Sequence, residues 1–194
     1  MDQEHIYDLI IIGAGPAGLS AGIYAGRATL DTLILEADTV GGQVTTTSIV
    51  YNYPAAPAID GTKLANQMQK QAADFGVTIK RDGVQEVQLD GEIKVITTKS
   101  GHQYQARSVV VATGAHPRKV GFKGEDEFRG RGVAYCSTCD GELFSGLQVF
   151  VVGGGYAAAE EADYLTRYAK HVTVLVRGDH FSCPPLTASR ALDN

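Results

Sequence analysis

The most constraining feature of this 194-residue sequence is a glycine motif between a buried strand and a helix. Residues 7–12 form a short apolar run rich in isoleucine, as in a strand that is buried on both faces of a parallel sheet. Apolar residues at helical spacing follow the motif, and a second strand is predicted at residues 32–35, ending at Glu36. The segment therefore predicts a complete βαβ unit.

The motif consists of three glycines with a proline and an alanine inside it, namely Gly13, Gly15, Gly18, Pro16 and Ala17. The first glycine of such a motif permits the turn, the second allows a pyrophosphate to approach, and the third packs the helix on the sheet. The helix N-terminus then faces the anion. Glu36 lies 18 residues after the last glycine, near the offset at which a carboxylate accepts a hydrogen bond from a ribose hydroxyl. The sequence therefore predicts a dinucleotide site here.

The same order of strand, glycine motif, helix and strand returns near the end of the sequence. The predicted strand, helix and strand are residues 147–152, 155–168 and 171–176. The motif holds Gly153 and Gly155, and Ala158 replaces the third glycine, which the pattern allows. Arg177 lies 19 residues after Ala158, where an arginine favours a 2′-phosphate and so NADP. A lone arginine at a strand end is equally an ordinary solvated residue.

The segments between the two units predict a loop, a helix and further strands. Residues 38–60 hold two glycines, two prolines and no sustained periodicity, which indicates a long functional loop. Asp60 is predicted to cap a helix that runs to about Phe75. Alternation within residues 77–101 predicts small antiparallel strands beside the main sheet, and residues 108–112 predict another buried parallel strand.

A domain boundary is predicted in residues 116–132, which hold one proline, four glycines and eight charged residues. Boundaries fall in such segments because few contacts cross them. The expected fold class is α/β, with two Rossmann-like dinucleotide-binding folds. Residues 1–116 would form one domain with a parallel sheet and a small antiparallel layer, and residues 117–194 a second, incomplete domain.

Charge and the N-terminal residues argue against several classes of protein. The formal net charge of -5 and the sequence pI of about 5.5 leave no basic stripe for a phosphate backbone, so no nucleic-acid partner is expected. The N-terminal MDQEHIYD is acidic and polar, and the apolar run behind it is short and broken by glycine. Neither a signal peptide nor a membrane span is predicted, and a cytoplasmic protein is expected.

Three cysteines occur in the sequence, and two of them form Cys136-Ser-Thr-Cys139 ahead of the second βαβ unit. In a reducing compartment this spacing indicates a redox pair that closes into a disulfide, with Cys183 left free. No metal is expected, because a zinc site commonly needs a second such pair. Asp140 follows the pair. A partly buried acid there would protonate the thiolate that leaves when the disulfide is reduced, although Asp-Gly also favours a simple turn.

These motifs together resemble those of bacterial low-molecular-weight thioredoxin reductases along the whole chain. The resemblance rests on CSTCDG between two dinucleotide folds and on the segments Gly41-Gly42-Gln43, Asn52-Tyr53-Pro54 and Ala112-Thr113-Gly114. It implies FAD on the first glycine motif. The residues that it places along or near the FAD are Gly41, Gly42, Gln43, Asn52, Thr113 and Gly114.

The resemblance also implies a redox cycle and an assembly. Cys136 and Cys139 would exchange electrons with the flavin and then with a thioredoxin-like partner. In the family, the domain that carries the CxxC rotates against the FAD domain, so that flavin meets nicotinamide and disulfide in turn. The complete protein is expected to be a homodimer.

One departure from the family pattern concerns the electron donor. Family members that use NADPH carry His-Arg-Arg and a further arginine at the end of the second strand of the pyridine domain. This sequence reads Val176-Arg177-Gly178-Asp179-His180-Phe181-Ser182 there, so only one of three arginines is kept. The implied donor is therefore NADPH or NADH, with ferredoxin as the alternative that some relatives with eroded sites use.

A second departure concerns length. The family continues through the rest of the pyridine domain and returns to complete the FAD domain with a Gly-Asp motif, which this sequence lacks. A chain shortened at its C-terminus is therefore expected. Three hypotheses follow: a flavoprotein disulfide reductase, a dithiol oxidase of the same fold that passes electrons to oxygen, and a non-catalytic fragment that binds a dinucleotide.

Overall fold

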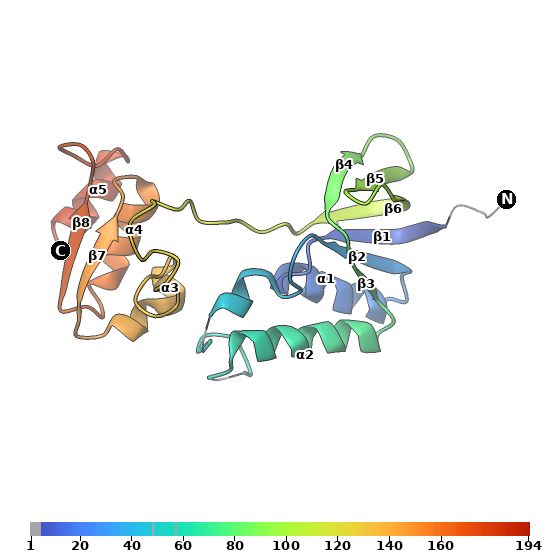
Figure 1. Ribbon diagram of the computed structural model, residues 1–194, viewed down its shortest axis with the longest axis horizontal. Coiled ribbons are helices and arrows are strands. Elements are labelled where there is room, and N and C mark those ends of the chain that lie inside the picture. Colours follow the sequence, from blue (N-terminus) through green and yellow to red (C-terminus); the bar gives the residue numbers. More distant parts are fainter. Residues whose placement is uncertain (1–4, 48, 57) are drawn as a thin grey trace. The chain divides into compact units, whose positions relative to one another are not determined.

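The computed structural model describes residues 5–47, 49–56 and 58–194, and its chain divides into two units, Met1–His116 and Pro117–Asn194. Each unit has its own sheet, six-stranded in the first and two-stranded in the second (Figure 1). Within the described ranges, none of the helices is long and apolar enough to cross a membrane.

The first unit is built on its six-stranded sheet. The strands are β1 (Ile6–Ile12), β2 (Thr32–Glu36), β3 (Thr78–Arg81), β4 (Val84–Gln88), β5 (Lys94–Thr98) and β6 (Gln103–Val111). Their order in the sheet is β3-β2-β1-β6-β5-β4. Strands β3, β2, β1 and β6 pair in parallel, while β6, β5 and β4 pair antiparallel to one another. A parallel α/β sheet with an antiparallel edge results, which confirms the predicted fold class.

The predicted N-terminal βαβ unit is present. Strands β1 and β2 pair in parallel with Ile12 opposite Leu35, and helix α1 (Pro16–Arg27) connects them. Ile34 and its neighbours in β2 are buried, as a strand covered on both faces requires.

The sheet differs from the prediction at three places. Thr78–Arg81 was expected among the antiparallel strands, but it pairs in parallel with β2, where Ile79 lies opposite Ile34. The hairpin of β4 and β5 is antiparallel as predicted. It is also hydrogen-bonded to β6, so it extends the main sheet and does not form a separate layer. Strand β6 is longer than predicted because its first residues pair with β5, and Val111 at its end is 65% exposed, not buried.

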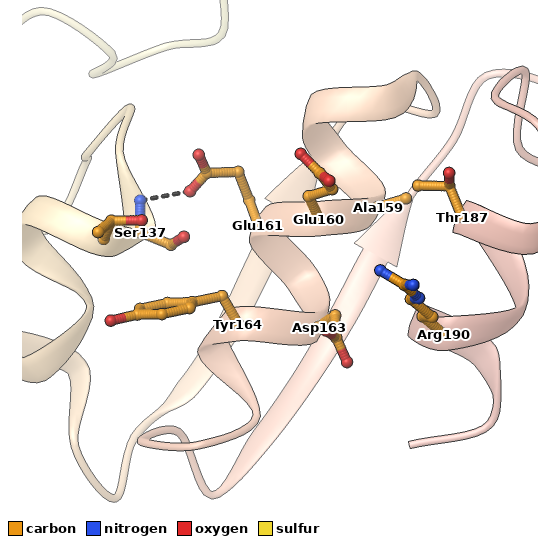
Figure 2. Close-up of a pocket in the computed structure, with 9 residues that line it drawn as sticks. Ser137, Ala159, Glu160, Glu161, Asp163, Tyr164, Thr187 and Arg190 are labelled. Atoms are coloured by element: carbon orange, nitrogen blue, oxygen red, sulfur yellow. Dashed lines mark hydrogen bonds between the residues drawn. The ribbon is translucent and has the colours of Figure 1, made fainter.

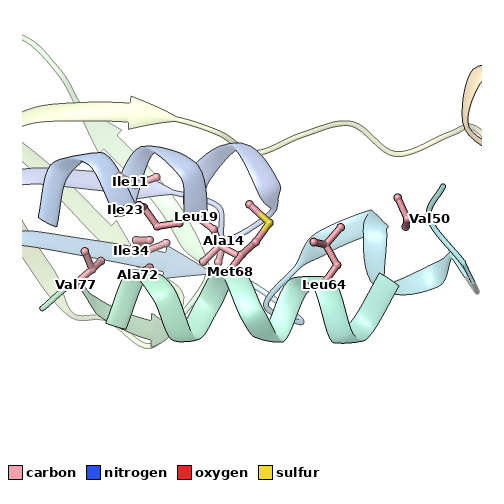
Figure 3. Close-up of a cluster of buried hydrophobic side chains, with 10 residues drawn as sticks. All are labelled: Ile11, Ala14, Leu19, Ile23, Ile34, Val50, Leu64, Met68, Ala72 and Val77. Carbon is pink, nitrogen blue, oxygen red and sulfur yellow. The ribbon is translucent and has the colours of Figure 1, made fainter. Parts of the chain in front are cut away.

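Helices α1 and α2 (Gly61–Asp74) cover one face of the sheet (Figure 1). Alternate strand residues point to opposite faces, so Ile11 and Ile34 pack with the helices while Ile10 and Leu33 join a second cluster. Each fully buried aliphatic side chain contributes about 1.5–3 kcal/mol to stability. Figure 3 shows the helix-side cluster, which consists of Ile11, Ala14, Leu19, Ile23, Ile34, Val50, Leu64, Met68, Ala72 and Val77.

Helix α2 begins where the sequence predicts. The Asp60 carboxylate accepts a hydrogen bond from the Lys63 amide at 2.8 Å, which is an N-cap. The segment before it was expected to be one long loop. It contains a short 3-10 helix, η1 (Gly42–Thr46), and an isolated antiparallel bridge between Val50 and Ile59. These contacts order a segment that has no periodic sequence pattern.

The second unit holds the second βαβ unit. Strands β7 (Gln148–Val152) and β8 (His171–Leu175) pair in parallel, and helix α4 (Tyr156–Leu165) connects them. The helix ends three residues earlier than predicted because residues 166–168 form a turn. Three short elements were not predicted, namely α3 (Ser137–Asp140), η2 (Gly141–Phe144) and α5 (Pro185–Leu192).

Candidate functional site

The loop after β1 is shaped by its first and third glycines. Gly13 has a φ of 105°, and a Cβ on it would lie 2.4 Å from the carbonyl oxygen of Ala112, just after β6. A Cβ on Gly18 would lie 1.9 Å from the carbonyl oxygen of Gly13. Both positions therefore exclude a side chain, and both pack the loop and α1 against the sheet.

Gly15, the second glycine, has a different environment. Apart from its own chain neighbours, none of the described residues has an atom within 4 Å of the position that its Cβ would occupy. Gly15 is the N-cap of α1, and no described side chain caps the helix there. Pro16 follows in the first turn, and Ala17 beside it is exposed. This backbone is therefore open at a helix N-terminus, where free amides and the helix dipole favour an anionic group.

Glu36 at the end of β2 reaches back to the glycine loop. Its carboxylate accepts hydrogen bonds from the Ala14 amide at 2.6 Å and from the Asp38 amide at 2.9 Å. The acid is half-buried, and it holds the loop that joins the first two glycines. A carboxylate has about four acceptor positions, so these two bonds leave capacity for a ribose hydroxyl.

Two further predicted segments meet the same loop. The Gly41 amide donates to the Ala14 carbonyl oxygen at 2.8 Å, and a Cβ on Gly42 would lie 3.4 Å from Gly15 Cα. The Gln43 side-chain amide donates to the Ala115 carbonyl oxygen, which ties this segment to the chain that follows β6. Gly41, Gly42 and Gln43 therefore lie beside the open glycine.

Thr113 and Gly114 lie just after Ala112, the residue that follows β6, and both are exposed. The Thr113 Cα lies 3.2 Å from the position that a Cβ on Gly13 would occupy. Asn52 is also exposed, but it lies between the β-bridge residue Val50 and Tyr53, whose hydroxyl contacts Met68. The structure thus brings Thr113 and Gly114 to the glycine loop and places Asn52 in the segment that follows the bridge residue Val50.

The sheet topology explains why these residues converge. The chain moves from β1 through β2 to β3 on one side, whereas β6 lies on the other side of β1. The order of strands therefore reverses between β1 and β6, and all the loops described above leave the carboxyl ends of strands. In open α/β sheets, ligands bind in the crevice at such a switch point.

The second glycine motif repeats the local geometry of the first with residue numbers shifted by 140. The Gly13 amide donates to the Leu35 carbonyl oxygen at 2.8 Å, and the Gly153 amide donates to the Leu175 carbonyl oxygen at 3.0 Å. Gly155 caps α4 with a φ of -85° and a ψ of -174°, close to the -73° and -178° of Gly15. Nothing described lies within 4 Å of a Cβ on Gly155 either.

The two motifs differ in their outer residues. A Cβ on Gly153 would lie 3.2 Å from the Cβ of Ala158. Because Gly153 has no side chain, the motif can hold alanine at its third position. Val176 occupies the place that corresponds to Glu36 and packs against Gly154. Arg177 is the next residue and is exposed. The second motif therefore has an open glycine but no carboxylate at the strand end.

The redox pair lies in the second unit. Cys136 and Cys139 form a disulfide across α3, with their Cα atoms 5.3 Å apart, and Cys183 is free. Cys136 is the N-cap of this short helix, and the Cys139 amide donates to its sulfur at 3.2 Å. Cys139 is exposed and Cys136 is half-buried. The pair is therefore accessible to another molecule.

Asp140 completes the turn that carries the pair. Its amide donates to the Cys136 carbonyl oxygen at 3.0 Å, and its side chain is half-buried. Burial raises the pKa of the Asp140 carboxyl above its usual value, and the negative charge of Glu161 raises it further. Both effects favour the protonated form that a proton donor needs.

The chain that leads into the pair is anchored by Glu125, which sequence analysis missed. This buried carboxylate accepts hydrogen bonds from the Val120 amide at 2.9 Å, the Gly121 amide at 2.6 Å and the Tyr135 hydroxyl at 2.8 Å. The bond from Val120, followed by the other two, holds the pKa of Glu125 below its usual range. Tyr135 directly precedes Cys136, so this anchor fixes the approach to the redox turn. No local pattern marks Glu125, because its partners become neighbours only in the fold.

A cavity of about 270 Å³ adjoins the redox turn. Figure 2 shows that it lies between the turn, α4 and α5. The Glu161 carboxylate on α4 points at Ser137 and accepts a hydrogen bond from its amide. The lining residues are Ser137, Thr138, Ala159, Glu160, Glu161, Asp163, Tyr164, Thr187 and Arg190.

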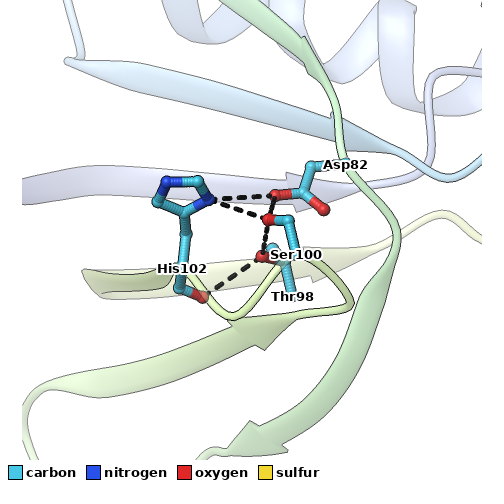
Figure 4. A network of polar contacts seen from close by, with 4 residues as sticks. All are labelled: Asp82, Thr98, Ser100 and His102. Carbon is cyan, nitrogen blue, oxygen red and sulfur yellow. Dashed lines mark hydrogen bonds and ion pairs between the residues drawn. The ribbon is translucent and has the colours of Figure 1, made fainter.

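A second polar cluster has the residue types of a nucleophilic triad but not its geometry (Figure 4). The Ser100 hydroxyl donates to Asp82, and the same oxygen lies 2.8 Å from Nδ1 of His102. In a triad the imidazole lies between the acid and the hydroxyl and uses both ring nitrogens, whereas here the serine is central. Thr98 adds a contact at 3.1 Å to Ser100, so the cluster closes the turn between β5 and β6.

The arrangement of the cysteines predicts the outcome of disulfide mapping. After air oxidation and alkylation of the unfolded chain, we expect label only on Cys183, and a peptide in which Cys136 and Cys139 remain linked. Peptide mass analysis with and without reduction measures this. A bridge between Cys183 and either member of the pair would contradict the assignment.

The comparisons with known proteins all point to one family. Residues 7–192 match the pyridine nucleotide-disulphide oxidoreductase family. The thioredoxin reductase of Bacillus subtilis (strain 168) is 44% identical over 194 residues, which are 100% of this chain and 61% of the relative. The bifunctional thioredoxin reductase/thioredoxin of Mycobacterium leprae (strain TN) is 43% identical, over 99% of this chain and 42% of the relative.

A solved structure extends the comparison to three dimensions. The crystal structure of thioredoxin reductase from Streptococcus pyogenes MGAS5005 superimposes with a TM-score of 0.91 at 40% identity, covering 99% of this chain and 62% of that chain. The chain therefore spans about 60% of the length of the Bacillus subtilis and Streptococcus pyogenes proteins.

Proposed function

Because the chain belongs to the pyridine nucleotide-disulphide oxidoreductase family, we propose that it acts as a flavin-dependent dithiol/disulfide oxidoreductase of the thioredoxin reductase type. The observation that carries the proposal is the accessible Cys136–Cys139 disulfide, which accompanies two glycine loops of dinucleotide-binding geometry in one chain.

In this proposal the first glycine loop holds FAD. Support comes from the open backbone at Gly15, from the two flanking glycines that exclude side chains, and from the carboxylate of Glu36. The residues proposed to contact the cofactor are Gly13, Gly15, Pro16, Ala17, Gly18, Glu36, Gly41, Gly42, Gln43, Asn52, Thr113 and Gly114. FAD, when bound, supplies the two-electron link between a reduced nicotinamide and a disulfide.

The second glycine loop is proposed to hold the nicotinamide dinucleotide. Support comes from the open backbone at Gly155 and from the repeat of the first motif's hydrogen bonds. The residues assigned to it are Gly153, Gly155, Ala158 and Arg177.

The cysteine pair completes the proposed reaction. The Cys136–Cys139 bond takes up two electrons and two protons and opens into two thiols. A thiolate of the pair then attacks one sulfur of a partner disulfide, and the other cysteine displaces the partner from the mixed disulfide. The partner leaves as a dithiol, and the pair is oxidised again. Asp140 is proposed to give a proton to the thiolate that leaves when the Cys136–Cys139 bond opens, and to regain one from solvent.

A thioredoxin-like protein is the proposed partner. The Mycobacterium leprae relative carries a reductase and a thioredoxin in one polypeptide, which supports this choice. Steady-state reduction of a thioredoxin by the FAD-loaded protein tests the proposal. Turnover that disappears in Cys139→Ser supports it. Oxidation of small dithiols by oxygen, with release of hydrogen peroxide and without reduction of thioredoxin, would contradict it.

The residues that follow β8 predict only a weak preference for NADPH over NADH. Arg177 alone offers a charged contact to a 2′-phosphate, and a charge-assisted hydrogen bond contributes about 1.5–3 kcal/mol, or roughly ten- to a hundredfold in affinity. We therefore expect NADPH to be preferred by less than about a hundredfold in kcat/KM. The two nucleotides are compared in wild type and in Arg177→Ala, with reduced ferredoxin as a third donor. A larger preference that disappears in Arg177→Ala would contradict the prediction.

A further inference from the structure

Glu161 links the body of the second unit to the redox turn. It lies on α4, and its carboxylate accepts a hydrogen bond from the amide of Ser137, the residue that directly follows Cys136 (Figure 2). Ser137 is only 7% exposed, so this contact forms away from bulk water. The bond holds Ser137, the first residue of α3, in place. Cys136 directly precedes Ser137 and Cys139 lies in the same short helix, so the bond also positions both cysteines.

The Glu161 carboxylate also affects the pKa of Asp140. Several titratable groups lie on the elements packed around the turn, namely Glu160, Glu161, Asp163 and Tyr164 on α4, Tyr168 after it, Glu142 on η2 and Arg190 on α5. Apart from burial, the charge of Glu161 is the influence that raises the pKa of Asp140. Glu160, one residue earlier, instead raises the pKa of the exposed Tyr156 hydroxyl.

We propose that Glu161 is a positioning residue that couples helix α4 to the redox pair and to its proton donor. The proposal rests on the proposed function, because it assigns Glu161 a part in opening the Cys136–Cys139 bond. Glu161 itself forms no bond to the reacting atoms. It holds the turn through Ser137, and its negative charge favours the protonated form of Asp140.

In the reaction, Glu161 affects the transfer of one proton from Asp140 to the leaving sulfur. When an external dithiol reduces the disulfide, its thiolate forms a bond to one sulfur of the pair, and the other sulfur leaves with the electron pair of the broken bond. The Asp140 carboxyl gives its proton to that sulfur and recovers one from solvent. A second displacement releases the oxidised reagent. At pH values above the pKa of Asp140, the rate of the assisted step therefore falls with the protonated fraction of this carboxyl.

Glu161→Gln separates charge from hydrogen bonding, because the amide oxygen of glutamine still accepts from Ser137. We expect the pKa of Asp140, followed by carboxyl-carbon NMR titration of the 194-residue chain, to fall by about half a unit or more. Reduction of the pair by dithiothreitol at pH 7 is expected to slow by about threefold. In an Asp140→Asn background, Glu161→Gln should add no further slowing. Glu161→Ala should in addition speed hydrogen exchange of the Ser137 amide.

Glu160→Gln is the matched control, since it removes an equal charge from the neighbouring position of the same helix. We expect it to leave the pKa of Asp140 and the reduction rate unchanged. The inference is overturned if Glu161→Gln leaves that pKa unchanged, or if Glu160→Gln lowers it equally. A wild-type pair that does not cycle between disulfide and dithiol would overturn the proposed function itself, and the two failures are therefore distinguishable.

Discussion

Replacing Gly15 with valine is expected to weaken FAD binding by about two orders of magnitude or more while leaving the fold intact. The backbone of Gly15 is extended, with a φ of -73° that any residue adopts, and its Cβ position is free of described neighbours. The added Cβ would therefore clash with none of the described residues, and the side chain would fill the space proposed for the pyrophosphate. We expect binding to weaken by at least about a hundredfold, which corresponds to roughly 2.8 kcal/mol.

Fluorescence titration of FAD into wild-type and variant chains measures this loss. The free energy of unfolding should change by only about 0.5 kcal/mol, as for an uncrowded surface site. Gly155→Val is the matched control, because it makes the same change in the second glycine loop. FAD affinity that survives Gly15→Val and is lost in Gly155→Val would reverse the assignment of the two loops.

Replacing Gly18 with alanine is expected to have the opposite effect, damaging the fold itself. Its new Cβ would lie 1.9 Å from the Gly13 carbonyl oxygen, a backbone atom that cannot rotate away. Helix α1 would have to move off the sheet, and Leu19 next to it would leave the apolar cluster. We expect a loss of about 3 kcal/mol or more in stability of the first unit.

Hydrogen exchange of the β1 and β2 amides measures the stability of the first unit separately from the second. Gly15→Ala serves as the control, since it adds the same methyl group to the same loop where space is open. Equal exchange rates in Gly18→Ala and Gly15→Ala would mean that the loop relaxes around the added group and that close packing at Gly18 is not required.

Local sequence signals predicted the parts of the fold that depend on local interactions. Strands β1 and β2 and the cap at Asp60 follow from apolar runs and capping chemistry that a short window contains. Strand β3 was assigned wrongly because a four-residue segment, Thr78–Arg81, has no pattern that distinguishes parallel from antiparallel partners. Its pairing with β2 is decided by the tertiary structure.

The candidate site shows the same division. The glycine loops and the cysteine spacing are visible in the sequence, because each is a contiguous motif with its own backbone requirements. Glu125 and Glu161 were missed, since each acts on residues at least four positions away through a hydrogen bond that exists only in the folded unit. The opposite case is the cluster of Ser100, Asp82 and His102. These residue types are those of a catalytic triad, but their arrangement in the fold only stabilises a turn.

In the proposed reaction, electrons delivered to FAD in this protein reach the Cys136–Cys139 disulfide. Counting free thiols before and after anaerobic addition of excess NADPH to the FAD-loaded protein tests it most directly. We expect a rise from one free thiol, that of Cys183, to three free thiols, together with bleaching of the flavin. Flavin that bleaches while the count stays at one thiol would contradict electron transfer from FAD to the disulfide.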